Sequence, residues 1–389
     1  MKISQRISNL GTYAFAEVDK KIKELKAQGI KPIDFGVGDP ADPTPEFIYN
    51  SLQRATEKHK STGYPSYIGM KEYREKVAQW FNSRFGVSLD PDTEISSTVG
   101  SKEAVFHFPF GFVDAGDVVL VPTPGYPPYA RGTQFAGGEA YFLPLRRENK
   151  FLIDFEEIPE EVAKKAKILW INYPNNPTGA VASEDFIKKA IDFCQKNDII
   201  LASDECYTEF YRSEKPLSVL EYTKEAIVFG SLSKRSNMTG YRVGFVAGKK
   251  EIIDVFKKVK TNIDSGTPNF IQEAAITALS DEDHVITANA KYLEKMDILA
   301  DALSIAGLPD CRPKATFYLW QEVPEKIGAL NFLNKLLSPE VGIVCTPGAW
   351  ISDQTASGEN PGENFVRFSL TPTKEKVIEA AEKIKKMSF

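Results

Sequence analysis

The fold is decided by one stretch of the chain, Ser231-Leu232-Ser233-Lys234-Arg235-Ser236-Asn237-Met238-Thr239-Gly240-Tyr241-Arg242-Val243-Gly244. It follows an apolar run that predicts a buried strand, and it forms a small, hydroxyl-rich loop around one lysine, Lys234. A lysine held near hydroxyls and a second cation, here Arg242, can lose its proton at neutral pH, as Schiff-base chemistry requires. Arg242 can also bind a phosphate bidentately, and Ser231 can add a hydroxyl. The alternative is a surface turn rich in Ser and Lys.

Around this loop, short apolar runs alternate with helical stretches from about residue 95 onward. Several runs lack polar alternation, which is expected of strands buried on both faces. Residues 183–197 predict a crossover helix with Ser183 as its N-cap and acidic residues in its first turn. This alternation predicts a mostly parallel sheet covered by helices. The predicted strands are residues 118–121, 140–145, 167–173, 199–203, 226–230 and 243–247.

The two ends of the chain have a different pattern. Residues 16–29 and 71–85 predict amphipathic helices, and residues 33–40 predict a short strand that runs into a Gly/Pro turn. At 389 residues the chain is too long for one core of ordinary size. We therefore expect residues 1–47 to form an N-terminal arm and part of a small domain, residues 48–289 a large domain, and residues 290–389 a small C-terminal domain. In the small C-terminal domain, the sequence predicts helices at 291–306, 331–337 and 373–386 and strands at 316–322, 343–346 and 365–370.

Composition excludes several classes of protein. A formal net charge of −5 argues against a nucleic-acid or anionic-membrane surface, since both need excess Lys and Arg. No apolar run approaches the roughly 18 residues of a membrane span, and residues 1–11 lack the apolar core of a signal peptide. The cysteines form no C-x-x-C pair and have no histidine at a ligand-like spacing, so we expect no disulfide framework, no metal site and a cytoplasmic location. The four cysteines are Cys194, Cys206, Cys311 and Cys345.

The 231–244 segment resembles the pyridoxal-phosphate (PLP) attachment site of the class I and II aminotransferases, and further motifs follow in the order of that family. The resemblance implies an α/β fold of fold-type I. Its large PLP-binding domain has a mostly parallel seven-stranded sheet between helices, and its smaller domain is α+β. Lys234 would carry the cofactor as a Schiff base and then act as a general base.

Several further residues match cofactor contacts of the family. Asp204 ends a predicted strand thirty residues before Lys234, and a carboxylate buried there needs a partner. In the family this aspartate pairs with the pyridine nitrogen, which makes the ring an electron sink. The resemblance places Tyr207 and Asn176 at the 3′-oxygen of the cofactor and Tyr126 against its ring.

The expected phosphate loop is Gly100, Ser101 and Lys102, where a glycine precedes a predicted helix over 102–112 and free backbone N–H groups can meet an anion. Tyr64 matches a tyrosine that crosses a dimer interface to reach the neighbouring cofactor phosphate, which implies a homodimer.

The resemblance assigns the substrate α-carboxylate to Arg367, with Gly38 and Asn176 nearby. It implies transfer of an amino group between an amino acid, with glutamate expected, and a 2-oxo acid. The strings at 203–207 and 231–237 are similar to those of N-succinyldiaminopimelate aminotransferases of lysine biosynthesis. Aspartate, alanine or LL-diaminopimelate aminotransferases and a PLP-dependent β-lyase remain alternatives. A PLP-sensing regulator would carry a DNA-binding segment ahead of the fold, whereas here the family pattern begins within the first two dozen residues.

Overall fold

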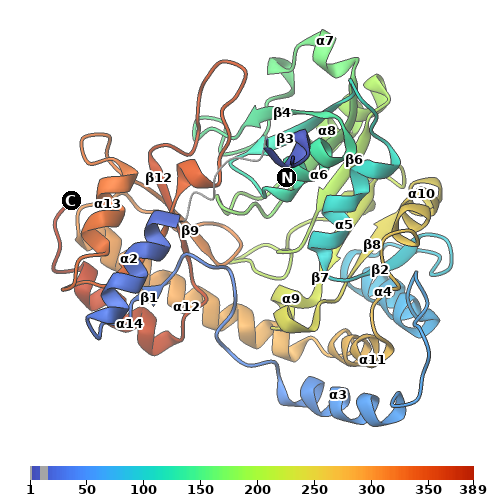
Figure 1. Cartoon of the computed structure of the whole chain (residues 1–389), viewed down its shortest axis with the longest axis horizontal. Coiled ribbons are helices and arrows are strands. Elements are labelled where there is room, and N and C mark those ends of the chain that lie inside the picture. Colours follow the sequence, from blue (N-terminus) through green and yellow to red (C-terminus); the bar gives the residue numbers. More distant parts are fainter. Residues whose placement is uncertain (1, 9–15) are drawn as a thin grey trace.

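The computed structural model describes residues 2–8 and 16–389. Met1 and residues 9–15, which belong to the expected N-terminal arm, lie outside the described residues. A seven-stranded sheet occupies the middle of the chain, in the order β2-β8-β7-β6-β5-β3-β4 (Figure 1). Only β8 is antiparallel to its neighbours in this sheet, so the prediction of a mostly parallel seven-stranded sheet is confirmed. The strands are β2 (Ile95–Thr98), β3 (Val118–Thr123), β4 (Glu139–Pro144), β5 (Ala166–Asn172), β6 (Ile200–Asp204), β7 (Ile227–Ser231) and β8 (Gly244–Gly248).

Both faces of this sheet are buried, because successive side chains on a strand point to opposite faces. On β3, Leu120 belongs to one apolar core, while Val119 and Val121 belong to another. On β5, Leu169 and Trp170 divide in the same way. The strands therefore appear in the sequence as continuous apolar runs without polar alternation.

Helices supply the other half of each core. The face that contains Val119 is packed by α5 (Ser101–His107), α6 (Pro128–Ala136) and α10 (Lys250–Lys260). The opposite face is packed by α3 (Glu46–Lys58), α4 (Lys71–Phe85), α8 (Glu184–Asn197) and α11 (Asn269–Ala278). As predicted, α8 begins with Ser183, whose hydroxyl oxygen accepts a hydrogen bond from the backbone N–H of Phe186 at 3.3 Å. Short helices α1 (Gln5–Ser8), α7 (Glu160–Ala163) and α9 (Leu232–Arg235) complete this part of the chain.

A third core joins the N-terminal part of the chain to its C-terminal part. Leu25, Ile33 and Phe35 pack with apolar residues from beyond residue 290, and β1 pairs in parallel with β10. Figure 1 shows α2 beside α14 and α13, although they lie at opposite ends of the chain. The strands β11, β12 and β9 form an antiparallel sheet within this unit. The elements are α2 (Ala16–Ala27), β1 (Ile33–Asp34), α12 (Asp283–Ile305), β9 (Tyr318–Glu322), α13 (Ala329–Leu336), β10 (Ile343–Val344), β11 (Thr346–Pro347), β12 (Phe365–Ser369) and α14 (Lys374–Ile384).

The long helix α12 connects the units. It begins at Asp283, eight residues before the predicted start at residue 291, so the expected domain boundary after residue 289 falls inside it. None of the helices within residues 2–8 and 16–389 is long and apolar enough to cross a membrane.

Candidate active site

The topology brings the predicted site residues to one edge of the central sheet. The strands β2, β3, β5, β6 and β7 run in the same direction, so their carboxyl ends lie together. Because β8 runs the opposite way, its amino end lies at this same edge, where open α/β sheets bind ligands. Five predicted residues sit there: Tyr126 after β3, Asn176 after β5, Asp204 at the end of β6, Lys234 after β7 and Arg242 just before β8.

These residues line a cavity of about 550 Å³. Two predicted residues, Gly100 and Tyr64, do not line it. Sequence reasoning missed Tyr129, Cys206, Tyr318 and Ile351, which also line the cavity. The predicted residues in its wall are Gly38, Ser101, Lys102, Tyr126, Asn176, Asp204, Tyr207, Ser231, Lys234, Arg242 and Arg367.

Lys234 is presented by the short helix α9. Ser231 caps this helix, since its hydroxyl oxygen accepts a hydrogen bond from the backbone N–H of Ser233 at 3.2 Å. The ammonium group of Lys234 donates a hydrogen bond to the backbone carbonyl of Gly38. Burial lowers the pKa of Lys234 to about 8, and the positive charges of Arg242 and Arg367 act in the same direction. About a tenth of this amine is therefore unprotonated at pH 7, far more than for a lysine with the ordinary pKa of 10.5.

Asp204 is a buried carboxylate, only 4% exposed. Its Oδ2 accepts a hydrogen bond from the hydroxyl of Tyr129 at 2.7 Å, and its Oδ1 accepts one from the backbone N–H of Cys206 at 3.2 Å. Burial raises the pKa of Asp204 from its ordinary value. Within the part of the chain that the structure describes, it has hydrogen-bond donors but no ion pair, so a cationic ligand group would stabilise its charged form.

Arg367 and two tyrosines form another part of the cavity wall. The Arg367 guanidinium lies 4.8 Å from the centroid of the Tyr318 ring, and the hydroxyls of Tyr318 and Tyr207 are 2.9 Å apart. Arg367 donates hydrogen bonds to Oδ1 of Asn176 at 3.0 Å and to the carbonyl of Gly36 at 2.8 Å. Its buried Nε has no partner, and no acidic side chain among the described residues pairs with it. An anion is the ligand that this cation needs.

Arg242 is another cation of the cavity that has no acidic partner among the described residues. Its Nη1 donates hydrogen bonds to the carbonyl of Thr239 at 2.8 Å and to Oγ of Ser233 at 3.4 Å. Gly100 lies directly against Nη2, where a Cβ atom would collide with the guanidinium, and its φ of +73° is in the left-handed region that favours glycine. A glycine at position 100 therefore lets the Arg242 guanidinium lie against the start of α5, next to Ser101.

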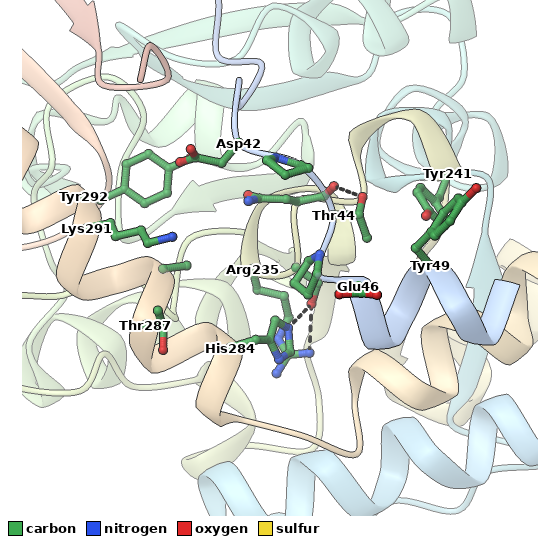
Figure 2. A pocket seen from close by; sticks show the side chains of 15 residues that line it. Asp42, Thr44, Glu46, Tyr49, Arg235, Tyr241, His284, Thr287, Lys291 and Tyr292 are labelled. Atoms are coloured by element: carbon green, nitrogen blue, oxygen red, sulfur yellow. Dashed lines mark hydrogen bonds between the residues drawn. The ribbon is translucent and has the colours of Figure 1, made fainter. Parts of the chain in front are cut away.

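A second cavity, of about 700 Å³, lies behind the lysine turn (Figure 2). Lys234 does not line it, whereas the next two residues, Arg235 and Ser236, do and have side-chain partners. Arg235 lies 2.5 Å from Oε1 of Glu282, and the Ser236 hydroxyl lies 2.8 Å from Nε2 of His284. The residues that follow the lysine are thus anchored away from the active-site cavity, and we place the candidate site in the smaller cavity.

Comparison with known proteins agrees with this geometry. Residues 30–384 match the sequence profile of the family described as aminotransferase class I and II. The chain is 46% identical over 393 residues to LL-diaminopimelate aminotransferase from Aquifex aeolicus, with 100% of both chains covered. It is 45% identical over 391 residues to the enzyme of the same name from Syntrophobacter fumaroxidans, with 99% of each covered. Among solved structures, a probable N-succinyldiaminopimelate aminotransferase from Thermus thermophilus superposes with a TM-score of 0.87 at 30% identity, over 95% of this chain and 99% of that one.

The chain belongs to the class I and II aminotransferases. It is therefore an enzyme that depends on pyridoxal 5′-phosphate and acts on amino acids and 2-oxo acids. The cavity suits this cofactor. It offers an amine of lowered pKa for the aldehyde, a buried carboxylate for the ring nitrogen, and for the phosphate the Arg242 guanidinium, which has no acidic partner among the described residues. When bound, the cofactor supplies an electron sink for negative charge at the substrate Cα.

Proposed function

We propose that Lys234 holds the cofactor aldehyde and afterwards moves the proton of the substrate Cα. Its lowered pKa, about 8, allows the same amine to take up and return a proton near neutral pH. Asp204 would pair with the ring nitrogen, since this carboxylate is buried without an ion partner among the described residues. Tyr207 and Asn176 would face the 3′-oxygen, and Tyr126 would lie against the ring, because all three line the cavity.

The phosphate would be held at the opposite end of the cavity. Arg242 supplies a guanidinium with no acidic partner among the described residues, and Gly100 lies against it. Ser101, Lys102 and Ser231 line the same cavity and can add donors. These assignments rest on the donors that line the cavity and on the Arg242 guanidinium, which lies where a Cβ at position 100 would collide with it.

The substrate α-carboxylate would bind Arg367. This guanidinium keeps an unpartnered buried Nε, and the two groups that accept its hydrogen bonds, the Asn176 amide and the Gly36 carbonyl, are neutral. Gly38 lies at the same wall, where a Cβ would be 2.5 Å from the Tyr318 hydroxyl oxygen, so the absence of a side chain keeps this approach open.

The amino acid that fits best is LL-diaminopimelate, with 2-oxoglutarate as amino acceptor and a role in lysine biosynthesis. One observation carries this choice: relatives at 46% and 45% identity, matched over essentially their whole length, have that name. The N-succinylated form is the second candidate, supported by the strings at 203–207 and 231–237 and by the Thermus structure at 30% identity.

A substrate panel tests this proposal. We would compare kcat/KM for LL-diaminopimelate, its N-succinyl form, glutamate, aspartate and alanine, each with an excess of 2-oxo acid. The free diaminopimelate should be preferred over its succinylated form. A preference for aspartate of roughly a hundredfold or more, with no turnover of either diaminopimelate, would contradict the proposal. A β-lyase would instead be indicated if an S-substituted cysteine, added without any acceptor, were converted to pyruvate, ammonia and the released thiol.

We also propose that the enzyme works as a homodimer in the cytoplasm. Tyr64 is 88% exposed and does not line the cavity of its own chain, as expected if it reaches the site of a partner. We further propose that the chain is divided into two domains. Residues 48–289 form the large domain, and residues 290–389 together with part of residues 1–47 form the small domain. The separate apolar core that unites Phe35 with residues beyond 290 supports it.

A further inference from the structure

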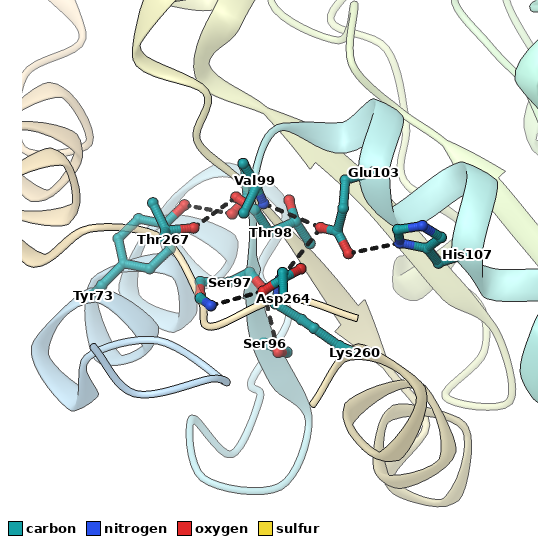
Figure 3. A network of polar contacts seen from close by, with 12 residues as sticks. Tyr73, Ser96, Ser97, Thr98, Val99, Glu103, His107, Lys260, Asp264 and Thr267 are labelled. Atoms are coloured by element: carbon teal, nitrogen blue, oxygen red, sulfur yellow. Dashed lines mark hydrogen bonds and ion pairs between the residues drawn. The ribbon is translucent and has the colours of Figure 1, made fainter. Parts of the chain in front are cut away.

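A partly buried group of charges lies next to the loop that opens α5 (Figure 3). Lys260, the last residue of α10, is 0% exposed. Its Nζ lies 2.7 and 2.9 Å from the two carboxylate oxygens of Asp264 and 3.4 Å from Oε2 of Glu103. We call these three residues the Lys260 cluster. Burying an ammonium group is costly, and a buried ion pair is weak evidence for stability, so the position of the cluster matters more than its existence.

Glu103 connects the cluster to the candidate phosphate loop. Its Oε2 accepts a hydrogen bond from the backbone N–H of Val99 at 3.1 Å, and its Oε1 lies 3.3 Å from Nδ1 of His107. Val99 directly precedes Gly100, the N-cap residue of α5 and the cradle for Arg242. The orientation of this peptide therefore depends on where the Glu103 carboxylate is held.

Asp264 connects the cluster to the segment that carries Tyr64. Its Oδ1 accepts a hydrogen bond from the backbone N–H of Gly266 at 2.7 Å. Gly266 packs closely on the chain at Ser66, since a Cβ there would be 2.5 Å from the Ser66 carbonyl oxygen. The next residue, Thr267, donates its hydroxyl to the carbonyl of Thr98 at 3.0 Å. The two segments proposed to reach cofactor phosphates are thus both connected to the Lys260 cluster.

We propose that Lys260 is a positioning residue for the cofactor phosphate, acting through Glu103 and Asp264. Its charge holds the two carboxylates together, because without a cation they would repel each other or take up a proton. If the carboxylates moved apart or took up a proton, the hydrogen bond from the backbone N–H of Val99 or Gly266 would be weakened. The loop before α5 could then shift. This inference rests on the proposed role of that loop in binding phosphate.

The test compares apoenzyme affinity for PLP with affinity for pyridoxal, which lacks the phosphate. Lys260→Met removes the charge and keeps a side chain of similar length. We expect it to weaken PLP binding by about tenfold or more, as for loss of one charge-supported contact, while pyridoxal affinity changes by less than about twofold. Lys258→Met, on the exposed side of the same helix, is the matched control and should change neither.

Three results would separate the alternatives. If wild-type apoenzyme prefers PLP over pyridoxal and Lys260→Met keeps that preference, the positioning role is wrong, even where the melting temperature falls. If wild type shows no preference for PLP, the proposed phosphate site itself fails. If Lys260→Met does not fold, Glu103→Ala decides, because it removes the acceptor of the Val99 N–H and leaves the pair between Lys260 and Asp264. A retained preference in that variant overturns the inference.

Discussion

At the scale of single residues, the site consists of charged groups that the fold buries without completing their contacts. Lys234 has a pKa lowered to about 8, Asp204 is 4% exposed without an ion pair among the described residues, and Arg367 keeps an unpartnered Nε. Each group costs stability in the protein alone, because its desolvation is uncompensated. In the proposed function, each group binds a charge or the aldehyde of the cofactor or substrate. Ligand binding would then supply the interactions that these side chains lack in the protein alone.

The lowered pKa of Lys234 predicts how cofactor capture depends on pH. Only the neutral amine attacks the aldehyde, so the rate constant for capture should rise with pH and level off above about 8. Mixing apoenzyme with PLP in a stopped-flow instrument between about pH 7 and 10 measures this midpoint. A midpoint near 10.5, the ordinary value for lysine, would show that burial does not tune this amine.

Loss of Arg367 should weaken every amino-acid donor by a similar factor. All donors share the α-carboxylate, and a charge-assisted bidentate contact contributes roughly 1.5–3 kcal/mol, or about ten- to a hundredfold in apparent affinity. Half-reactions of Arg367→Ala with glutamate, alanine and LL-diaminopimelate provide the comparison. An effect restricted to donors with a second carboxylate would place Arg367 at the distal end of the substrate.

At the scale of elements, most central strands were predictable because both faces of the sheet are buried. Each such strand is therefore a continuous apolar run in the sequence. Of these strands, β2 was missed because Ser96, Ser97 and Thr98 are fully buried hydroxyl residues that look like a loop in sequence. The helix α4 was predicted with its observed bounds, since a buried stripe repeats at helical spacing and Gly86 ends it in a left-handed conformation.

Other elements depend on contacts that the sequence does not display. No helix was predicted over residues 128–136, but Pro128 begins α6, because a proline is tolerated in the first turn of a helix. The helix expected over 102–112 ends at His107 and continues as a 3-10 turn over Phe108–Gly111, where Pro109 has no N–H to donate. Tyr318 was missed for a different reason, since only the packing of β9 against β12 brings it to Arg367.

The start of α5 gives a prediction at this scale. Gly100→Ala adds a methyl group where Arg242 lies, on a backbone with φ of +73°, and should weaken PLP binding by about tenfold or more. Gly86→Ala is the matched control, because its φ is +69° but nothing lies within 4 Å of the added atom. It should lower the melting temperature and leave PLP affinity unchanged. Equal PLP affinities for the two variants would mean that the cradle is not used.

At the scale of the whole molecule, the cavity lies between the central sheet and the C-terminal unit. Arg367 and Tyr318 come from the antiparallel strands of that unit, and Gly38 from the segment before α3. The residues proposed to hold the cofactor come from the sheet edge instead. In the proposed function, substrate recognition is therefore assembled from segments far apart in sequence, and in the proposed dimer the exposed Tyr64 would be a further contribution, supplied by a second copy of the chain.

Hybrid dimers test that contribution. Lys234→Ala subunits and Tyr64→Phe subunits should each be impaired alone. A mixed dimer contains one site with an intact lysine from one chain and an intact tyrosine from the other, so dissociating and reassociating the mixture should restore activity. The same proteins mixed without dissociation serve as the control. No recovery, with hybrids detected by native mass spectrometry, would mean that Tyr64 acts within its own subunit or not at all.

The central claim, that Lys234 holds the cofactor, has a direct measurement. Borohydride reduction of the PLP-loaded enzyme fixes the cofactor covalently to the lysine that binds it, and peptide mapping then identifies that residue. The adduct should lie on Lys234 alone, and Lys234→Ala should give no stoichiometric adduct and lose turnover by several orders of magnitude. A stoichiometric adduct on any other lysine, with Lys234 unmodified, would contradict the account.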